Sequence, residues 1–206
     1  MRLVIFSDTH CAHEELNMPE GDLLIFAGDM CGYGHKKEAK RFIKWMSDLP
    51  HKYKVCICGN HDWPFYKYLG FAKDSFESTG IHYLQDSSVE IDGLKIYGSP
   101  WQPEFCNWAF NLPRGKQLAE KWAMIPDDTD ILITHGPPAT IRDCCPTSVG
   151  CDDLLKRVYE IKPKLHVFGH IHTQWGISFR DGITFINASI VDDYNTKVNN
   201  SIEWEL

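Results

Sequence analysis

The sequence predicts an α/β protein in which two β-sheets are each backed by helices. Short continuous apolar runs, at residues 2–7 and 23–27 among others, are typical of strands that are covered on both faces. Amphipathic segments with a helical period alternate with such runs, and Asp-Gly turns join shorter strands further along the chain. Because no linker interrupts this pattern, we expect residues 1–206 to form one domain.

The first half of the chain predicts a strand–helix–strand unit. Strands are expected at residues 2–7, 23–27 and 54–58. The helix expected over residues 35–48 has four apolar residues at helical spacing, Ala39, Phe42, Ile43 and Met46. Pro50 supports an end just before it. The sheet should therefore be partly parallel, with a right-handed crossover.

The second half predicts an antiparallel part and further helices. Short strands at 82–85, 88–91 and 94–99 suggest antiparallel pairing, because Asp92-Gly93 is a strong hairpin signal. Residues 101–113 are aromatic and irregular, and helices are expected at 114–125 and 151–161. The remaining strands are expected at 130–134, 165–168, 175–179, 183–187 and 202–205.

Composition excludes several classes of protein. The formal net charge of −7 disfavours an extended nucleic-acid track or a membrane-surface binder, since both usually need a basic face. No apolar run approaches the roughly 18 residues of a membrane span, and no signal peptide is evident. With eight cysteines and no zinc-ribbon spacing, we expect reduced thiols in a cytoplasmic protein. Nothing in the sequence indicates an oligomeric state.

Side chains that can bind metal follow five of the apolar runs, directly where each run ends. They are Asp8, His10, Asp29, Asn60, His61, Asp62, His135, His170 and His172. The carboxyl ends of parallel strands lie on one edge of a sheet, which is where ligands bind in α/β folds. We therefore expect these side chains to meet, although they are spread over about 160 residues.

The number of candidate ligands predicts two metal ions. The ligand set is Asp8, His10, Asp29, Asn60, His135, His170 and His172. Since one zinc ion takes three or four protein ligands, seven suggest two ions that share a carboxylate. Mixed nitrogen and oxygen ligands favour Mn, Fe, Zn or Co over Mg or Ca. Two divalent ions would outweigh the two carboxylates, and the resulting positive site suits a phosphate ester.

Such a site can hydrolyse a phosphoester. Two metal ions roughly 3.5–4 Å apart can hold a bridging hydroxide and stabilise both ends of an in-line displacement at phosphorus. The leaving oxygen needs a proton or a positive partner, and His61, which stands next to Asn60 but outside the ligand set, can serve. Two roles remain open for Asp62, which either orients the His61 imidazole or caps its own loop.

These motifs resemble the signature of a known family. Five blocks carry the resemblance, in order along the chain: Asp8-Thr-His10, Gly28-Asp29, Gly59-Asn-His-Asp62, His135-Gly136 and Gly169-His-Ile-His172. Together they resemble the calcineurin-like metallophosphoesterases. The stretches GSPWQPEFCNWAFNLPRG, DILITHGPP, VGCDDLLKRV and LHVFGHIH are also similar to the metallophosphoesterase domain-containing (MPPED-type) branch.

The resemblance implies a four-layer α/β/β/α sandwich with two mixed β-sheets. It implies that one metal is held by Asp8, His10, Asp29 and His172. It implies that the other is held by Asp29, Asn60, His135 and His170, so that Asp29 bridges the two. His61 resembles the proton donor or phosphate-contacting histidine of the family. The thiols of Cys11 and Cys31 follow two of the motifs and are either oxidation-sensitive or inert packing groups.

The expected function is hydrolysis of phosphodiesters, cyclic nucleotides included. The alternatives are a phosphomonoesterase, a protein phosphatase or a nuclease on the same site, or a non-catalytic scaffold that keeps the fold. A small nucleotide would need an aromatic platform for its base. Six aromatic residues near the motifs are candidates, with packing between layers as the alternative: Trp63, Phe65, Tyr66, Trp101, Trp108 and Phe110. The expected substrate-binding residues are Asn60, His61 and Trp101.

Overall fold

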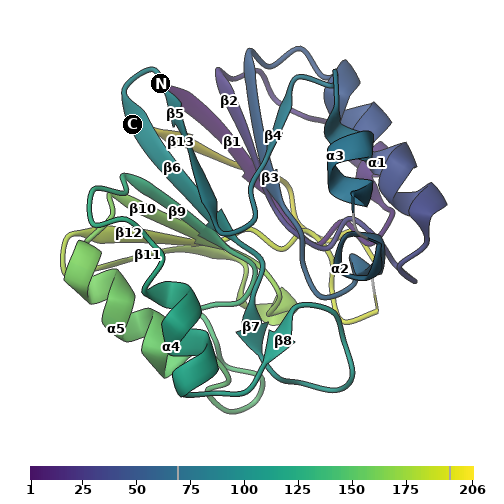
Figure 1. Ribbon diagram of the computed structural model, residues 1–206. Coiled ribbons are helices and arrows are strands. Elements are labelled where there is room, and N and C mark those ends of the chain that lie inside the picture. Colours follow the sequence, from purple (N-terminus) through teal and green to yellow (C-terminus); the bar gives the residue numbers. More distant parts are fainter. Residues whose placement is uncertain (69, 195) are drawn as a thin grey trace.

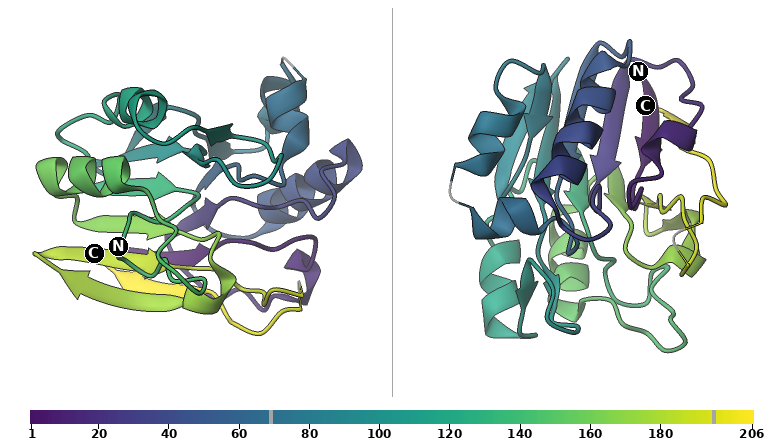
Figure 2. Two further views of the ribbon diagram at one scale, coloured as in Figure 1. Left: turned by 90° about the horizontal axis from the view of Figure 1, so that it is seen from below. Right: turned by 90° about the vertical axis from the view of Figure 1, so that its right-hand side faces the viewer.

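Two mixed β-sheets pack face to face, and helices cover the outer face of each, in the computed structural model of residues 1–68, 70–194 and 196–206 (Figure 1). Figure 2 shows the same layers from two further directions. This confirms the predicted four-layer α/β/β/α arrangement.

The first sheet contains most of the N-terminal strands. Its order is β13 (Ile202–Glu205), β1 (Arg2–Phe6), β2 (Leu23–Ala27), β3 (Tyr53–Ile57) and β4 (Ile81–Tyr83). Strands β1 to β4 are parallel, and β13 runs antiparallel to β1. The helices of this half are α1 (Lys36–Asp48), α2 (Trp63–Lys67) and α3 (Phe71–Phe76), with the short 3-10 helix η1 (His13–Glu15).

The second sheet is formed by later strands. Its order is β11 (Gly176–Arg180), β12 (Ile183–Asn187), β10 (Leu165–Phe168), β9 (Ile131–Thr134), β6 (Leu94–Ser99) and β5 (Ser87–Ile91). The outer layer consists of α4 (Lys116–Trp122) and α5 (Asp152–Ile161). A small ribbon of β7 (Gln102–Pro103) and β8 (Asn111–Leu112) and the 3-10 helix η2 (His172–Gln174) lie outside this sheet.

Three details differ from the sequence prediction. The strand expected at 82–85 in the antiparallel part belongs to the first sheet: β4 pairs in parallel with β3, because α3 supplies the crossover that a parallel pair needs. The stretch 101–113, expected to be irregular, contains the β7–β8 pair. The short helices α2 and α3 were not anticipated. The predicted hairpin at Asp92-Gly93 is present between β5 and β6.

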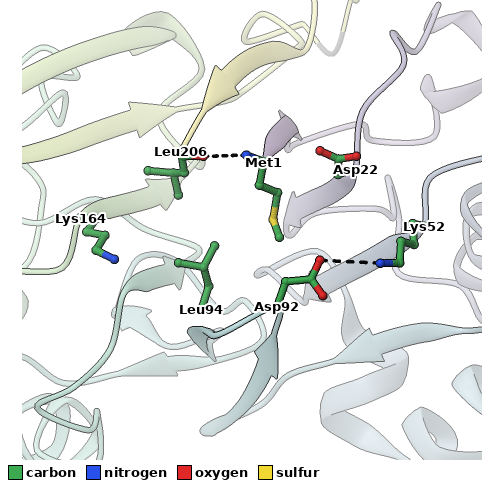
Figure 3. A pocket seen from close by; sticks show the side chains of 7 residues that line it. All are labelled: Met1, Asp22, Lys52, Asp92, Leu94, Lys164 and Leu206. Carbon is green, nitrogen blue, oxygen red and sulfur yellow. Dashed lines mark hydrogen bonds and ion pairs between the residues drawn. The ribbon is translucent and has the colours of Figure 1, made fainter.

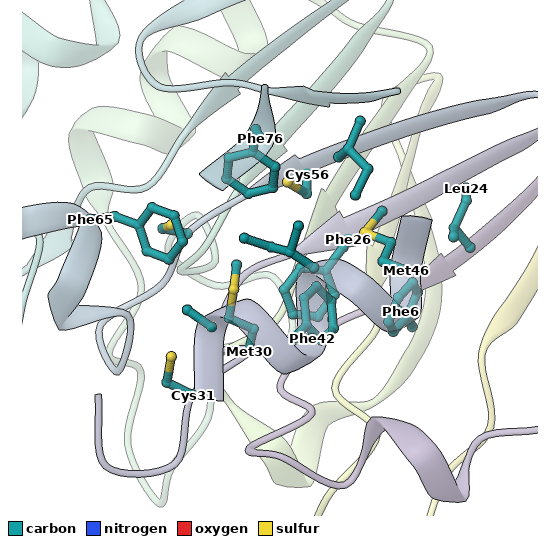
Figure 4. Close-up of a cluster of buried hydrophobic side chains, with 14 of the residues drawn as sticks. Phe6, Leu24, Phe26, Met30, Cys31, Phe42, Met46, Cys56, Phe65 and Phe76 are labelled. Carbon is teal, nitrogen blue, oxygen red and sulfur yellow. The ribbon is translucent and has the colours of Figure 1, made fainter. Parts of the chain in front are cut away.

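The period of two in the strands divides the core into three clusters. In β1, Val4 and Phe6 face α1, whereas Leu3 and Ile5 face the second sheet. Figure 4 shows the cluster beneath α1, where Phe26 and Phe42 pack with ring centroids 4.4 Å apart. Each fully buried side chain of this size contributes roughly 1.5–3 kcal/mol of burial free energy. The apolar faces therefore fix both sheets and orient their edges.

The amino ends of the strands form an edge that is distant from the candidate ligands. There, the N-terminal ammonium of Met1 donates a hydrogen bond to the carbonyl of Leu206 at 2.6 Å. Lys52 and Asp92 lie 3.7 Å apart on the wall of a cavity of about 530 Å³ (Figure 3). The residues that line this cavity precede or begin strands, except Leu206, which follows the antiparallel strand β13. The cavity therefore lies opposite the edge at which the ligand motifs end.

A buried histidine supports the loop after β9. His166 in β10 has no exposed surface, and its Nε2 donates to Thr134 Oγ1 at 2.8 Å. The Thr134 hydroxyl donates in turn to the carbonyl of Gly136 at 2.8 Å. Within the described residues, His166 Nδ1 has no hydrogen-bond partner. Burial lowers the pKa of His166 to about 3, since a second proton would find no acceptor.

This histidine should make the fold sensitive to acid. The unfolded chain takes up the proton near the ordinary pKa of 6.5, whereas the folded chain does so only near 3, so stability is complete above pH 6.5 and falls below it. We expect a loss of about 1.4 kcal/mol per pH unit from this group. In urea unfolding with a chelator present, His166→Gln should lose less unfolding free energy than the wild type between pH 6.5 and 5. His82→Gln, at an exposed position, should lose as much as the wild type. The same loss in all three proteins would contradict the role of His166.

Candidate metal centre

The candidate ligands lie where five strands end, at one edge of the molecule. Asp8 follows β1, Asp29 follows β2, Asn60 follows β3, and His135 follows β9. After β10 come His170 and, at the start of η2, His172. These side chains form three overlapping groups, and within each group the possible ligand atoms lie within 4.8 Å of one another. The groups are Asp8, His10 and His172; His10, Asp29 and His61; Asp8, Asp29 and His135.

The Asp29 carboxylate lies at the middle of this cluster. Its Oδ2 is 3.6 Å from His10 Nε2 and 3.3 Å from His135 Nε2. His135 Nε2 also lies 2.9 Å from the Asn60 amide oxygen. Asp29 therefore touches residues of both predicted ligand sets, as a shared ligand must.

The remaining ligands extend the cluster on either side of Asp29. Asp8 Oδ1 is 3.7 Å from His172 Nε2. Asp8 Oδ2 accepts hydrogen bonds from the Ser189 hydroxyl at 2.6 Å and the His170 backbone N–H at 3.0 Å. The His170 and His135 rings have centroids 5.1 Å apart. All seven predicted ligands thus lie in one continuous network of contacts.

Backbone carbonyls orient the imidazole rings. Nδ1 of His10 lies 3.2 Å from the Cys31 carbonyl, Nδ1 of His135 lies 2.9 Å from that of Ala27, and Nδ1 of His172 lies 2.9 Å from that of Asp192. A carbonyl oxygen only accepts, so each Nδ1 carries the hydrogen and directs Nε2 toward the carboxylates. Metal-ligating histidines use their second nitrogen in this way.

The backbone at the centre is unusual in two respects. Four candidate ligands, although not glycine, have left-handed φ values: Asp8 at 53°, His10 at 40°, Asp29 at 62° and His170 at 66°.

The glycines of the motifs pack directly on the candidate ligands. A β-carbon at Gly59 would overlap the Asp29 carboxylate and the His135 ring, and one at Gly169 would overlap the Asp8 carboxylate. Gly59 and Gly169 are therefore required to be glycine, because the ligand side chains lie too close to leave room for a β-carbon.

The charges of the cluster are mutually dependent. Burial opposes ionisation of Asp8 and Asp29, but the neighbouring histidines hold the pKa of both carboxyls below the ordinary value. Against the effect of burial, the same carboxylates raise the pKa of His135 and of His172 to about 9. Burial lowers the pKa of His10 to about 4 and that of His170 to about 3.

This arrangement fits divalent metal ions. His10 Nε2 is buried, points at Asp29 and has no hydrogen-bond partner among the described residues. A buried ring nitrogen without a partner is costly unless another ligand uses it. The donors are carboxylate and amide oxygens and imidazole nitrogens, a mixture that suits transition metals.

Asp62 holds the two loops that carry the ligands. Its buried carboxylate accepts backbone N–H hydrogen bonds from Gly59 at 2.8 Å, Asp29 at 3.0 Å, Cys31 at 3.0 Å and Met30 at 3.4 Å. Burial and the Asp29 carboxylate raise the pKa of Asp62 to about 6, against these hydrogen bonds. The alternative that Asp62 orients the His61 ring is wrong, because its oxygens face these backbone groups.

Other groups hold His61. Its Nδ1 donates to the Gly32 carbonyl at 2.7 Å, and its backbone N–H donates to Asp29 Oδ1 at 2.8 Å. The Trp108 ring stacks on the imidazole, with centroids 4.1 Å apart and planes 23° from parallel. The next residue, Ala109, donates its N–H to the Asn60 carbonyl at 3.1 Å. The sequence offers Trp108 as one of six aromatic candidates without distinguishing it from the rest. The structure distinguishes it, because the hydrogen bond from Ala109 to Asn60 brings the Trp108 ring onto His61.

Trp101 occupies a packing position. Its Nε1 donates to Asp86 Oδ2 at 2.8 Å, and the ammonium of Lys121 lies 4.5 Å from the ring centroid. The ring also meets Phe110 edge to face. Phe110 and Phe65 are buried in the core beneath α1, and Trp63 and Tyr66 contact each other edge to face. These contacts match the packing alternative rather than a platform for substrate.

The cysteines nearest the centre are protected from ionisation. Burial raises the pKa of the Cys31 thiol, and the Asp62 carboxylate adds to the effect. Burial also raises the pKa of Cys11. All eight cysteines are free. Because the thiolate is the reactive form, Cys11 and Cys31 have the character of inert packing groups.

Comparison with known proteins identifies the family. The family described as calcineurin-like phosphoesterase matches residues 1–174. Metallophosphoesterase domain-containing protein 1 of Homo sapiens is 44% identical over 214 residues, which cover 92% of this chain and 66% of the relative. The chain belongs to the calcineurin-like metallophosphoesterases.

One further relative is similar in sequence, and one solved structure is similar in fold. The UPF0046 protein K07C11.7 of Caenorhabditis elegans is 39% identical over 92% of this chain and 69% of its own length. The crystal structure of TT1561 of Thermus thermophilus shares the fold, with a TM-score of 0.63 over 90% of this chain and 88% of that one, at 14% identity. The chain thus spans about two thirds of the length of its curated relatives.

Family membership accounts for the kind of side chains that meet at this edge. A metallophosphoesterase is a phosphoester hydrolase that depends on divalent metal ions, and the ligand groups found here are of the kind that such chemistry requires. Through the described ranges of the chain, no helix combines the length and apolar character needed to cross a membrane.

Asp62 should be necessary for a properly formed centre. Asp62→Ala removes the acceptor of four backbone N–H groups, so we expect a loss of about 3 kcal/mol in unfolding free energy and weaker metal binding. Asp143→Ala is the matched control, since Asp143 is also buried and accepts backbone N–H groups from Thr140 and Gly150. The control should lose stability but keep its metal stoichiometry. Unchanged metal affinity in Asp62→Ala would contradict this role.

Proposed function

We propose that this protein is a dinuclear metal-dependent phosphodiesterase. One ion would be held by Asp8, His10, Asp29 and His172, and the other by Asp29, Asn60, His135 and His170. The observation that carries the proposal is the position of Asp29, whose Oδ2 faces Nε2 of both His10 and His135 at 3.6 and 3.3 Å. We infer that the ions are drawn from Mn, Fe, Zn and Co, which suit this donor set.

When bound, two such ions supply Lewis acidity and an activated water for attack at phosphorus. The chain contributes the positions of the ligands and their burial. Asp8 and Asp29 are nearly or fully buried, so their charges act through a medium less polar than water. Divalent ions would exceed their charge and leave a positive site for the phosphate group.

His61 is proposed to provide the proton for the leaving oxygen. Its Nδ1 is engaged by the Gly32 carbonyl, which leaves Nε2 to face the substrate. The stacked Trp108 ring and the hydrogen bond from the His61 backbone to Asp29 restrict the orientation of the imidazole. A positioned general acid of this kind typically contributes roughly 10²–10⁴-fold in rate.

The preference for diesters is supported by the surroundings of the centre. A cavity beside His170 offers room for a second organic group, which a monoester lacks. The net charge of −7 argues against a nuclease acting on long nucleic acid, whose backbone needs a basic track. A non-catalytic scaffold is disfavoured because all seven ligands are present. Small diesters, cyclic nucleotides included, are the proposed substrates.

Two further properties are proposed on indirect grounds. Residues 1–206 are proposed to act as one domain, because a shared layer of apolar side chains lies between the two sheets. A cytoplasmic location is proposed because all eight cysteines, several of them exposed, are free thiols.

A substrate panel with a matched pair of variants tests this function. The protein is loaded with Mn, Fe, Zn or Co and assayed on 2′,3′- and 3′,5′-cyclic nucleotides, linear diesters and monoesters. We expect higher kcat/KM for a diester, two metal equivalents in the wild type, and neither turnover nor full loading in Asp29→Ala. The exposed Asp152→Ala should behave as wild type. Full activity of Asp29→Ala on a chromogenic diester would disprove the dinuclear mechanism.

His61 can be tested separately from metal binding. His61→Ala should lower kcat about 10²–10⁴-fold while both metal equivalents remain bound, because the residue acts on the leaving group. The loss should be smaller for p-nitrophenyl esters than for alkyl esters, since p-nitrophenolate leaves without protonation. A uniform loss for both leaving groups would assign His61 to phosphate binding instead.

A further inference from the structure

A second cavity, of about 250 Å³, opens directly beside the metal centre. His170 and Gly136 form the wall nearest the ligands. Phe105, in the loop that joins β7 to β8, and Val149, in the segment between β9 and α5, also line the cavity. A molecule in this cavity therefore touches one of the proposed metal ligands.

The walls of the cavity are held in place. Arg114 donates from Nη1 to the Gly150 carbonyl at 2.7 Å and from Nη2 to the Val149 carbonyl at 2.6 Å. Asn111 holds the loop that contains Phe105, because its amide donates to the Phe105 carbonyl at 2.9 Å. The Arg114 guanidinium thus joins the segment before α4 to the loop before α5. Because both loops are held by hydrogen bonds within the protein, the cavity is formed without a ligand.

The lining favours a flat neutral group. The Phe105 side chain is 64% exposed at the rim, and Pro137, Val149 and Ile171 add apolar surface. Glu104 and Arg114 also line the cavity, with opposite charges. Among the described residues the Glu104 carboxylate has no hydrogen bond or ion pair, whereas the Arg114 guanidinium is bonded to two carbonyls and keeps its charge. An exposed aromatic face attracts a ring, and one charge of each sign gives a second anion no net attraction.

We propose that this cavity binds the non-leaving organic group of a phosphodiester, and that this group is a neutral aromatic ring that stacks on Phe105. The inference rests on the proposed phosphodiesterase function and names its substrate class. His170 lines the cavity and His61, the proposed proton donor, does not. The leaving oxygen therefore lies away from the cavity, and the ester group that remains on phosphorus enters it.

Three esters with the same leaving group test this inference. They are phenyl p-nitrophenyl phosphate, ethyl p-nitrophenyl phosphate and p-nitrophenyl phosphate. Attack of water at phosphorus breaks the bond to p-nitrophenolate in each case, and the phenyl diester leaves phenyl phosphate. Wild type should favour the phenyl over the ethyl diester in kcat/KM. Phe105→Ala should lower kcat/KM for the phenyl diester about tenfold and change the ethyl diester and the monoester less than twofold.

Phe179→Ala is the control, because Phe179 is 70% exposed on β11 and does not line the cavity. It should match wild type on all three esters. An equal loss on all three esters in Phe105→Ala would place the leaving group in the cavity, and no loss would leave the cavity without a role. Either result overturns the inference while the phosphodiesterase activity stands. Absence of turnover with every ester and metal would instead overturn the proposed function, and this inference with it.

Binding provides a readout that does not depend on turnover. By calorimetry on the metal-loaded protein, phenyl phosphate should bind about tenfold more tightly than methyl phosphate, and Phe105→Ala should remove the difference. Glu104→Gln should improve binding of 4-carboxyphenyl phosphate relative to phenyl phosphate by about threefold, since one opposing charge is removed. Equal affinities for phenyl and methyl phosphate in wild type would contradict the inference.

Discussion

One buried carboxylate sets the spacing of the metal centre. Asp62 gathers the backbone N–H groups of two loops, one that follows β2 and one that follows β3. Asp29 and His61 extend from those loops, and the His61 N–H closes the arrangement by donating to Asp29. The interaction is local, but it fixes the loop that carries Asp29, and Asp29 faces His10 from the first sheet and His135 from the second.

The centre also depends on the packing of one sheet against the other. Asp8 and Asp29 come from the first sheet, and His135 and His170 come from the second. The apolar layer between the sheets contains no chemistry of its own, but it fixes how the two edges meet. A change in that layer would displace one half of the ligand set relative to the other.

Most of the fold, and the gathering of the candidate ligands at one edge, could be predicted because both follow from local pattern. A buried strand is an apolar run, and a polar residue such as Asp8 or Asp29 directly after it marks the sheet edge. The short helices α2 and α3 were missed because they are too brief for a clear helical period. The role of Asp62 could not be settled, since both alternatives fit its position. Trp108 could not be singled out, since it meets His61 through a loop 47 residues further on.

The left-handed backbone at Asp8, His10, Asp29 and His170 has an evolutionary consequence. Each such residue costs on the order of 1 kcal/mol relative to glycine, which adopts this conformation without strain. A mutation to glycine would relieve that strain, but at Asp8 and Asp29 it would also remove the buried acceptor of hydrogen bonds from neighbouring groups. The carboxylates therefore hold the backbone in a conformation that they do not themselves favour. In a lineage that no longer needs the chemistry, these hydrogen bonds would still oppose loss of the two carboxylates, and the edge of the sandwich would keep its shape after its activity had gone.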